Sequence, residues 1–593
     1  MKFSNKTLLI ITAMLLCMSF GFTVQVALAG TVMTDTITQY GITWKLSTQC
    51  PVGQFVTGDY YVVGNCTVVS INPPFAGGRN GSELNPALNA AHSGYDSRAG
   101  DSLNGYVWDA GMCVTPPISM KPGDALVSTI SAANPSTIVP WLAVTGAGSC
   151  SPVLSACVLT CLSSAVPDDA FRPSYCDRTQ KIYLASNLKR NILPSLPYGK
   201  DTFVTATGTI PLSEFEDHYK RVWLNLVFFS FDVPVEYQPH YGHTLGRAMG
   251  MASLILMTDL PPARKEKLLI GFVQNGIDLW GIVKAGFGGW GAFGGHGTGR
   301  KWPIIFAGKM LGDTEMAQPT VTYPNLQFGE DMQTLAKPSW TGAKVVYAGH
   351  RGVDKYGNDV DSKVGWGQYE HLQPKDWPIE PAEPGMNEMY RHCCTSNGWI
   401  GMMLCAKMMH SEKKWNHDAF FDYCDRWMTE DDTTFVQVIK TQTNFSPYPA
   451  GGLSLSADQK KTWDPFVDEM WAKWRNNLPA DLDTTTVTSS SGGQEGRIVV
   501  YPNPAKISTS NGNTIKLTNF VSNSIVKIYN NQGQLVTTIT PGTIRGKTKY
   551  VFGTVAEWDG TNDSNENVSA GVYYCITDDG NGNNRKGKIA LLK

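Results

Sequence analysis

The sequence predicts a multidomain protein in which a helical region lies between two β-rich regions. The chain has 593 residues, more than a single hydrophobic core usually serves. Its apolar residues follow strand-like spacing before about residue 205, helical spacing from there to about 480, and strand-like spacing again from 497. Residues 481–496 are polar and rich in Ser, Thr and Gly, which indicates a flexible linker.

The N-terminus predicts export. Lys2 and Lys6 precede the apolar run Leu8–Phe22, and the small residues of Ala27-Leu28-Ala29 offer a cleavage site. Residues 1–29 are therefore expected to be a signal peptide. No later apolar run is long enough to span a bilayer, so no transmembrane segment is expected.

The net charge and the cysteine content limit which partners and which cellular compartment are expected. The formal net charge is −2 and no run of Lys or Arg stands out, so no nucleic acid is expected as a partner. Of the thirteen cysteines, all but Cys17 follow the signal peptide, and an oxidising compartment favours disulfides among them. Their pairing cannot be deduced from their spacing. The spacing matches no zinc motif, and neither a metal nor a cofactor is expected.

The first β-rich region, residues 30–205, is predicted to be a β-sandwich-like domain. Runs such as Gly41–Leu46, Tyr60–Val63, Thr67–Ile71 and Ala125–Ile130 are separated by clusters of Pro, Gly, Asn and Ser. Such a domain either contacts carbohydrate or serves as a structural module docked on its neighbour. We favour the structural interpretation.

The central region, residues 206–480, is predicted to be all-α. Seven segments have helical spacing: Glu214–Phe229, Tyr241–Leu260, Ala263–Ala285, Trp302–Leu311, Asn397–His410, Asp418–Met428 and Asp464–Leu478. Paired helices of this kind form a bundle, a solenoid or an (α/α) toroid, and we expect the toroid-like arrangement. Nine of the ten His and thirteen of the seventeen Trp lie between residues 201 and 480, so an active site is expected here.

Gly286–Trp302 is the most distinctive stretch of this region. Its glycines allow close approach to a ligand, while Trp290, His296, Arg300 and Lys301 offer a stacking surface, a titratable ring and positive charge. These properties are typical of a binding loop. The alternative is a flexible connection whose Trp side chains cap a core. A GxGxxG match at its start follows a helix rather than a strand, which excludes a dinucleotide site.

Three further clusters carry reactive side chains. His243 and Arg247 are four residues apart on one helical face, where the alternative is a solvated face or a structural network. Tyr369-Glu370-His371 lies in a loop-like region. Tyr390–Asn397 precedes a helix, whose free N–H groups suit a carboxylate. Cys393-Cys394 in this stretch offers a nucleophile, although exported thiols are more often oxidised or packed.

The last region, residues 497–593, resembles a known family. The motifs Val500–Pro504 (VYPNP), Tyr529–Val536 (YNNQGQLV), Trp558–Asp563 (WDGTND), Ser569–Tyr574 (SAGVYY) and Lys586–Lys593 (KGKIALLK) occur in order. They look like the immunoglobulin-like domain shared by flagellar hook-capping proteins and the C-terminal sorting domains of bacterial secreted enzymes. The resemblance implies an immunoglobulin-like β-sandwich, export and attachment to secretion machinery or the cell surface.

The absence of several catalytic motifs and the order of the predicted domains together suggest a function. The chain has no HExxH, no Walker loop and no GxSxG elbow. An exported, Trp-rich helical region beside a β-domain is similar in layout to toroidal polysaccharide lyases, and this similarity implies cleavage of a uronic-acid-containing polysaccharide by β-elimination. Alternatives are a glycoside hydrolase using Glu330, Asp331 and Glu370, or a non-catalytic glycan-binding protein of the cell surface.

Elimination needs a base, an acid and groups that stabilise a carboxylate. The residues expected to act as base or acid are His243, His296, Tyr369, His371 and Tyr390, and those expected to bind substrate are Arg247, Trp290, Arg300, Trp302, Arg391 and Asn397. The glycine-rich loop, the Tyr369 loop and the helix start at Tyr390 are expected to face one cleft.

Overall fold

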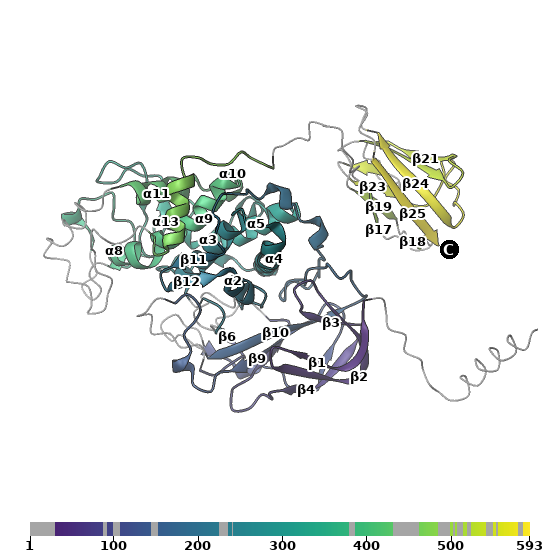
Figure 1. The fold of residues 1–593 in the computed structure, drawn as a ribbon, viewed down its shortest axis with the longest axis horizontal. Coiled ribbons are helices and arrows are strands. Elements are labelled where there is room, and N and C mark those ends of the chain that lie inside the picture. The colour runs from purple at the N-terminus through teal and green to yellow at the C-terminus, as the bar shows by residue number, and fades with distance from the viewer. Residues whose placement is uncertain are drawn as a thin grey trace, which may run out of the picture. The chain divides into compact units, whose positions relative to one another are not determined.

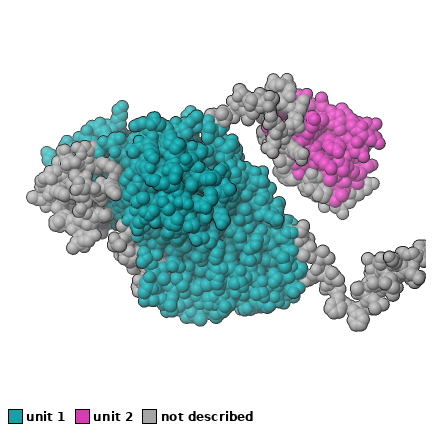
Figure 2. All heavy atoms as spheres, in the orientation of Figure 1, with its two compact units in different colours: residues 1–485 teal, residues 486–593 magenta. Residues whose placement is uncertain are grey.

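The computed structural model divides the chain into two compact units, Met1–Thr485 and Thr486–Lys593 (Figure 2). It describes residues 30–86, 92–98, 107–143, 152–224, 235–239, 241–378, 386–430, 462–483, 498–501, 505–506, 514–518, 524–540, 550–552, 555–578 and 585–592. The predicted signal peptide and most of the predicted linker lie outside the described residues. None of the described helices is long and apolar enough to cross a membrane.

The N-terminal region forms one eight-stranded sheet rather than the two layers of a sandwich (Figure 1). The order is β5-β9-β10-β3-β2-β4-β8, with β1 added beside β2. Strand β2 pairs with β4 through its first residues and with β3 through its last, so the sheet curves into a half-barrel. The strands are β1 (Val32–Gln39), β2 (Ile42–Gln54), β3 (Tyr60–Val63), β4 (Cys66–Asn72), β5 (Ser82–Leu84), β8 (Ile118–Met120), β9 (Ala125–Ser131) and β10 (Val153–Leu162). The prediction of a β-rich region is confirmed.

Strand β10 joins this sheet to the helical region. Alternate side chains of a strand point to opposite faces. Cys157, Leu159 and Cys161 belong to the core of the half-barrel, whereas Ala156 and Val158 belong to the core that the helices share. Both faces of the strand are therefore buried, which explains why sheet and helices form one unit.

A buried ion triad connects the same two regions. Arg172 is fully buried, and its guanidinium lies 2.7 Å from Asp59, next to the half-barrel, and 2.6 Å from Asp278. Asp278 belongs to α4 (Pro262–Lys284), the longest described helix of this unit. Because each charge has an opposite partner, the desolvation of the triad is offset by ion pairing.

The central region is helical, as predicted, with short β-ladders between the helices. Its longer helices are α2 (Leu212–Tyr219), α3 (Gly242–Leu256), α4, α5 (Lys301–Leu311), α9 (Ser396–Met408), α11 (Asp418–Thr429) and α13 (Pro465–Trp474). Its short helices are α6 (Pro319–Thr322), α7 (Gly329–Met332), α8 (Met386–Tyr390) and α10 (Glu412–Trp415). Its two-stranded ladders are β11 (Thr202–Thr205) with β12 (Gly208–Pro211), β13 (Gly289–Trp290) with β14 (Gln327–Phe328), and β15 (Thr334–Leu335) with β16 (Val346–Tyr347).

Helices α3 and α9 pack closely against each other (Figure 1). A Cβ atom on Gly250 would lie 2.8 Å from the Cα of Gly401, and one on Gly246 would lie 3.0 Å from the carbonyl oxygen of Gly398. Gly246 thus meets Gly398 and Gly250 meets Gly401, so the two helices run in the same direction. Both helices consequently begin at the same end of the pair, where the candidate site lies.

The second unit contains two sheets that share one hydrophobic core. The first sheet consists of β17 (Val499–Tyr501), β19 (Ile515–Thr518), β23 (Val555–Trp558) and β22 (Tyr550–Phe552). The second consists of β18 (Ala505–Lys506), β25 (Arg585–Leu592), β24 (Gly571–Asp578), β20 (Ile525–Asn530) and β21 (Leu535–Ile539). Trp558 from the first sheet packs against Tyr573 from the second, with ring centroids 5.4 Å apart.

Candidate functional site

The glycine-rich loop crosses the starts of α3 and α9. A Cβ atom on Gly242, the first residue of α3, would overlap the carbonyl oxygen of His296. One on Gly295 would overlap the carbonyl oxygen of Cys394, just before α9. The backbone N–H of Gly295 donates to the Tyr241 hydroxyl over 2.8 Å. The sequence therefore needs glycine here so that three backbones can touch.

Four side chains gather around Gly294 where these segments meet. The rings of His350 and Tyr390 lie 4.3 Å apart, and those of His350 and Phe293 lie 4.9 Å apart. Phe293 stacks on His296 with centroids 5.5 Å apart. The Gly294 N–H donates to the carbonyl oxygen of His350 over 3.0 Å. We call Phe293, His296, His350 and Tyr390 the Gly294 cluster.

Positive charge lies beside this cluster. The guanidinium carbon of Arg351 is 3.7 Å from the ring centroid of Phe293 and 4.9 Å from that of Trp366. The ammonium of Lys363 is 3.9 Å from the Trp366 ring. Phe293, Tyr390 and Arg351 are half-buried and Lys363 is exposed. The arrangement therefore offers aromatic rings and cations together at the protein surface.

No sequence pattern indicated His350, Arg351 or Trp366 as site residues. His350 is 2% exposed, and its backbone N–H donates to Asn387 over 2.8 Å. The only available signal was the short stretch Ala348-Gly349-His350-Arg351-Gly352, in which a His and an Arg stand between glycines. It belongs to no helix and repeats no motif, so periodicity could not reveal it.

The pKa values of two buried histidines are strongly lowered. Burial, together with Arg351 and Lys363, lowers the pKa of His350 to about 3. Burial and Arg247 lower the pKa of His243 to about 3. Both imidazoles are therefore neutral at neutral pH, because charging them in a low-dielectric environment is unfavourable.

The tautomer of His243 follows from its partner. The Asn397 amide donates through Nδ2 to the carbonyl oxygen of His392 over 2.8 Å. Its Oδ1 therefore faces His243, whose Nε2 lies 2.7 Å away and donates to it. The ring lone pair of His243 is consequently on Nδ1.

Tyr369 and Arg391, which directly follows Tyr390, are buried in a charge network. Arg391 lies 3.5 Å from Glu370 and 3.6 Å from Glu388, and its Nε donates to the Tyr423 hydroxyl over 2.9 Å. The Tyr369 hydroxyl donates to Glu388. This network holds α8, the helix that ends at Tyr390. The two residues are thus placed to position Tyr390, and their predicted contact with substrate stays a prediction.

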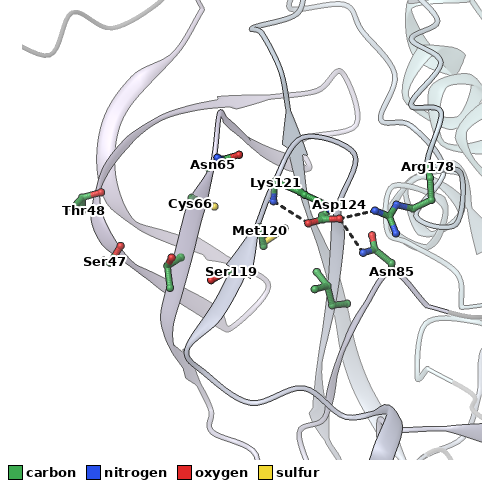
Figure 3. Close-up of a pocket in the computed structure, with 12 residues that line it drawn as sticks. Ser47, Thr48, Asn65, Cys66, Asn85, Ser119, Met120, Lys121, Asp124 and Arg178 are labelled. Atoms are coloured by element: carbon green, nitrogen blue, oxygen red, sulfur yellow. Dashed lines mark hydrogen bonds and ion pairs between the residues drawn. The ribbon is translucent and has the colours of Figure 1, made fainter.

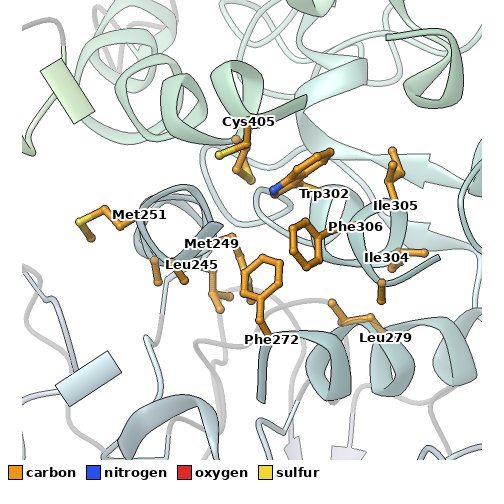
Figure 4. Close-up of a cluster of buried hydrophobic side chains, with 14 of the residues drawn as sticks. Leu245, Met249, Met251, Phe272, Leu279, Trp302, Ile304, Ile305, Phe306 and Cys405 are labelled. Atoms are coloured by element: carbon orange, nitrogen blue, oxygen red, sulfur yellow. The ribbon is translucent and has the colours of Figure 1, made fainter. Parts of the chain in front are cut away.

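Four predicted substrate-binding side chains are buried within the helical region. Arg247 pairs with Asp464 at 2.7 Å, and Arg300 Nη1 donates to the carbonyl oxygens of His296 and Thr298. Trp290 is 1% exposed and packs between Phe287 and Phe328, with centroid distances of 5.1 Å and 6.0 Å. Trp302 is fully buried among apolar side chains (Figure 4). These four side chains therefore contact other parts of the protein interior, and their predicted contact with substrate stays a prediction.

His371, the remaining predicted residue, is half-buried near Lys337 and Asp359. Burial and the charge of Lys337 lower its pKa. Of the predicted residues, His296 and Tyr390 belong to the Gly294 cluster, and His243 and Asn397 lie at the helix starts beside it.

A π-helical turn and a disulfide mark the segment between α8 and α9. Arg391–Thr395 forms the turn, and a disulfide joins Cys393 to Cys394 within it. The Thr395 hydroxyl donates to the Tyr390 carbonyl oxygen over 2.8 Å. Single π-helical turns are frequent at functional sites. Because the two sulfurs are bonded to each other, neither can act as a thiolate nucleophile. Of the alternatives considered for these cysteines, the structure contains the oxidised one.

The carboxylates considered for hydrolysis are engaged or uncharged. Burial and the neighbouring Asp331 raise the pKa of Glu330 to about 8. Asp331 is paired with Lys301. Glu370 is bound by Arg426 at 2.7 Å and by the Tyr347 N–H at 2.5 Å. Within the described residues, no group of three or more His, Cys, Asp or Glu is arranged to hold a metal ion.

Comparisons with known proteins give short matches only. No family model and no curated protein matches the chain. PorZ, a bacterial surface component of the type-IX secretion system of Porphyromonas gingivalis, is 18% identical over 16% of this chain and 11% of its own, with a TM-score of 0.13. Latent PorU from Porphyromonas gingivalis is 20% identical over 16% of this chain and 9% of its own, with a TM-score of 0.12.

A domain of a mouse protein matches the same share of this chain. The Ig1 domain of mouse SynCAM 2 is 13% identical over 16% of this chain and 96% of its own, with a TM-score of 0.11. This chain thus spans about a tenth of the length of PorZ and of PorU. At these TM-scores the matches assign neither a fold nor an activity to this chain.

Proposed function

We propose that the protein is an exported polysaccharide lyase that cleaves a uronic-acid-containing glycan by β-elimination at the Gly294 cluster. The observation that carries this proposal is the gathering of two buried imidazoles, the half-buried ring of Tyr390 and the guanidinium of Arg351 around Phe293 and Gly294. These are the groups that elimination beside a carboxylate requires.

Each group has a role in the reaction. His296 removes the proton at C5 of the uronate, while Arg351 stabilises the charge that develops on the carboxylate. The bond between C4 and the glycosidic oxygen breaks, and Tyr390 gives its proton to that oxygen. A C4–C5 double bond forms, and the proton on His296 returns to Tyr390 through water. His350 packs against Tyr390 as a neutral ring and positions it.

The state of the carboxylates supports elimination over hydrolysis. A glycoside hydrolase needs one carboxyl group as acid and a second as base or nucleophile, both beside the sugar. Glu330, Asp331 and Glu370 are instead buried, paired or uncharged. Non-catalytic binding of glycan uses the same aromatic and cationic surface and is an outcome of the test below.

We also propose the finer fold assignments that the sequence suggests. The parallel packing of α3 and α9 supports a toroid-like arrangement, in which alternate helices run in the same direction. The two sheets around one core, together with the ordered motifs of residues 497–593, support an immunoglobulin-like domain for sorting or surface attachment. Secretion machinery is the partner that such a domain implies.

The test incubates the full mature protein with a panel of uronate-containing and neutral polysaccharides. We expect shorter products that absorb ultraviolet light, because the new double bond is conjugated with the carboxylate. His296→Ala and Tyr390→Phe are each expected to lower the rate by at least about 100-fold. Tyr356→Phe, at a tyrosine that is 77% exposed, is the matched control and keeps the wild-type rate.

Three results would overturn the proposal. Shorter products without absorbance indicate a hydrolase, and saturable binding without shortening indicates a binding protein. Wild-type rates in a folded His296→Ala variant would remove His296 as the base.

A further inference from the structure

Three cysteines lie together in the core of the half-barrel. Cys50 is on β2, Cys66 begins β4 and Cys161 is near the end of β10. All three are buried in the same hydrophobic cluster and are present as thiols. Cys66 and Cys161 are far apart in the sequence, but β3 pairs with β10 and continues through Gly64 into Cys66.

The segment that carries Cys66 contacts Cys161. The Cys161 thiol donates to the carbonyl oxygen of Gly64, two residues before Cys66, over 3.1 Å. The Gly64 N–H donates to the carbonyl oxygen of Leu162 over 2.8 Å, so Gly64 is held on β10 from both sides. The interaction between the two thiols lowers the pKa of Cys66 and raises that of Cys161.

A cavity opens onto Cys66. It has a volume of about 690 Å³, and Cys66 lines it together with Asn65, Lys121, Asp124 and Arg178 (Figure 3). Arg178 pairs with Asp124 at 2.8 Å in the same lining. A small oxidant can therefore reach Cys66 without unfolding of the sheet, whereas Cys161 is fully buried.

We propose that Cys66 and Cys161 are a redox pair that forms a disulfide bond after export. The oxidant is a small-molecule disulfide. The Cys66 thiolate attacks one of its sulfurs and releases the other as a thiol, which gives a mixed disulfide. The Cys161 thiol then attacks Cys66 and displaces the second half of the oxidant. Two electrons pass to the oxidant, and the two thiol protons end on its sulfurs.

Cys50 is the competing partner. Its sulfur donates to the carbonyl oxygen of Thr48 over 3.6 Å. The Cys161 sulfur instead contacts Gly64, on the segment that leads directly into Cys66, and this contact favours Cys161 as the partner. The bond to Cys161 ties β4 to β10, the strand that carries the helices on its other face.

The test treats the reduced, full mature protein with oxidised glutathione and maps the products by mass spectrometry after alkylation of free thiols. We expect one peptide pair joining Cys66 to Cys161, which a reductant separates. The oxidised protein is expected to melt about 5 °C or more above the reduced one, and Cys66→Ser and Cys161→Ser each remove this difference.

Cys157→Ser is the matched control. Cys157 is 1% exposed in the same core and donates to the carbonyl oxygen of Gln39 over 3.3 Å. We expect this variant to keep the redox-dependent difference in melting temperature. Alkylation of both Cys66 and Cys161 after oxidation, or a peptide pair joining Cys66 to Cys50, would overturn the proposal. Neither result depends on the proposed lyase activity, which is measured separately.

Discussion

Gly294 shows at the scale of one residue why this loop is rich in glycine. Its φ of +54° lies in the left-handed region, and a Cβ atom on it would overlap the ring of Tyr390 and lie 3.1 Å from Nε2 of His350. Any side chain here must move one of the two rings. The position of Tyr390 therefore depends on the absence of a single carbon atom.

Gly294→Ala is expected to lower activity at least about tenfold and stability by about 1–3 kcal/mol, because the new methyl group displaces Tyr390. Steady-state rates and denaturant unfolding measure the two effects. Gly288→Ala in the same loop is the control, since no heavy atom lies within 4 Å of a Cβ there. Equal losses in both variants would argue against a specific role for Gly294.

His243 makes stability depend on pH. Its pKa is about 3 in the folded protein and about 6.5 when the chain unfolds, so the unfolded chain binds more protons between these values. Stability is therefore lost as the pH falls below about 6.5, by roughly 2 kcal/mol at about pH 5 from this residue alone. His243→Gln, which does not titrate, is expected to lose that part of the acid sensitivity in unfolding curves at about pH 7.5 and pH 5. An unchanged pH dependence would contradict it.

At the scale of elements, the site depends on the pairing of α3 with α9. Close approach of Gly250 and Gly401 sets the distance between the helices, and that distance lets His243 reach Asn397. The π-helical turn, Arg391–Thr395, then carries the chain from Tyr390 into α9. A change at the helix crossing is thus transmitted to the site, although no residue of the crossing belongs to it.

Gly401→Ala is expected to destabilise the protein by about 1–3 kcal/mol, because its Cβ would lie 2.9 Å from the Cα of Gly250 and push the helices apart. Activity should fall as well. Lys407→Ala, on the same helix with a half-buried side chain 3.8 Å from Asp425, is the control and should cost less than about 1 kcal/mol. Denaturant unfolding of both variants makes the comparison, and a Gly401→Ala variant as stable as the control would refute the role of the crossing.

At the scale of the first unit, the sheet and the helices belong to one compact unit. Strand β10 gives side chains to both cores, and the Arg172 triad bridges them. We expect neither residues 30–205 nor residues 206–480 to fold alone, because each would expose a face that the other covers.

Arg172→Leu is expected to destabilise this unit by about 3–5 kcal/mol, because it leaves Asp59 and Asp278 buried without a cation. Arg178→Leu, six residues on, breaks an ion pair in which the arginine is 52% exposed, and should cost less than about 1 kcal/mol. Thermal unfolding distinguishes them, and similar melting temperatures would show that the triad does not brace the unit.

The helices were predictable from sequence where apolar residues recur at helical spacing, as in α11, where the predicted segment Asp418–Met428 matches the observed Asp418–Thr429. Ladders such as β13 with β14 are two residues long and carry no pattern. Arg247 pairs with Asp464, which is 217 residues away in the sequence. From the sequence alone, His243 and Arg247 on one helical face therefore looked the same whether Arg247 bound substrate or formed a buried ion pair. His350 enters the candidate site through a loop, where spacing gives no information. The sequence thus indicated which residue types could act in a site, but it could not show the contacts that decide the role of each residue.

The two-sided burial of β10 also limits how this chain can change in length. Inserting or deleting one residue within the strand would exchange its two sets of side chains, sending Cys161 toward the helices and Val158 into the half-barrel. Substitutions by side chains of similar size can be tolerated in this strand, but a shift of its register by one residue cannot. In related sequences, gaps should therefore be absent from residues 153–162 and collect in the connections on either side.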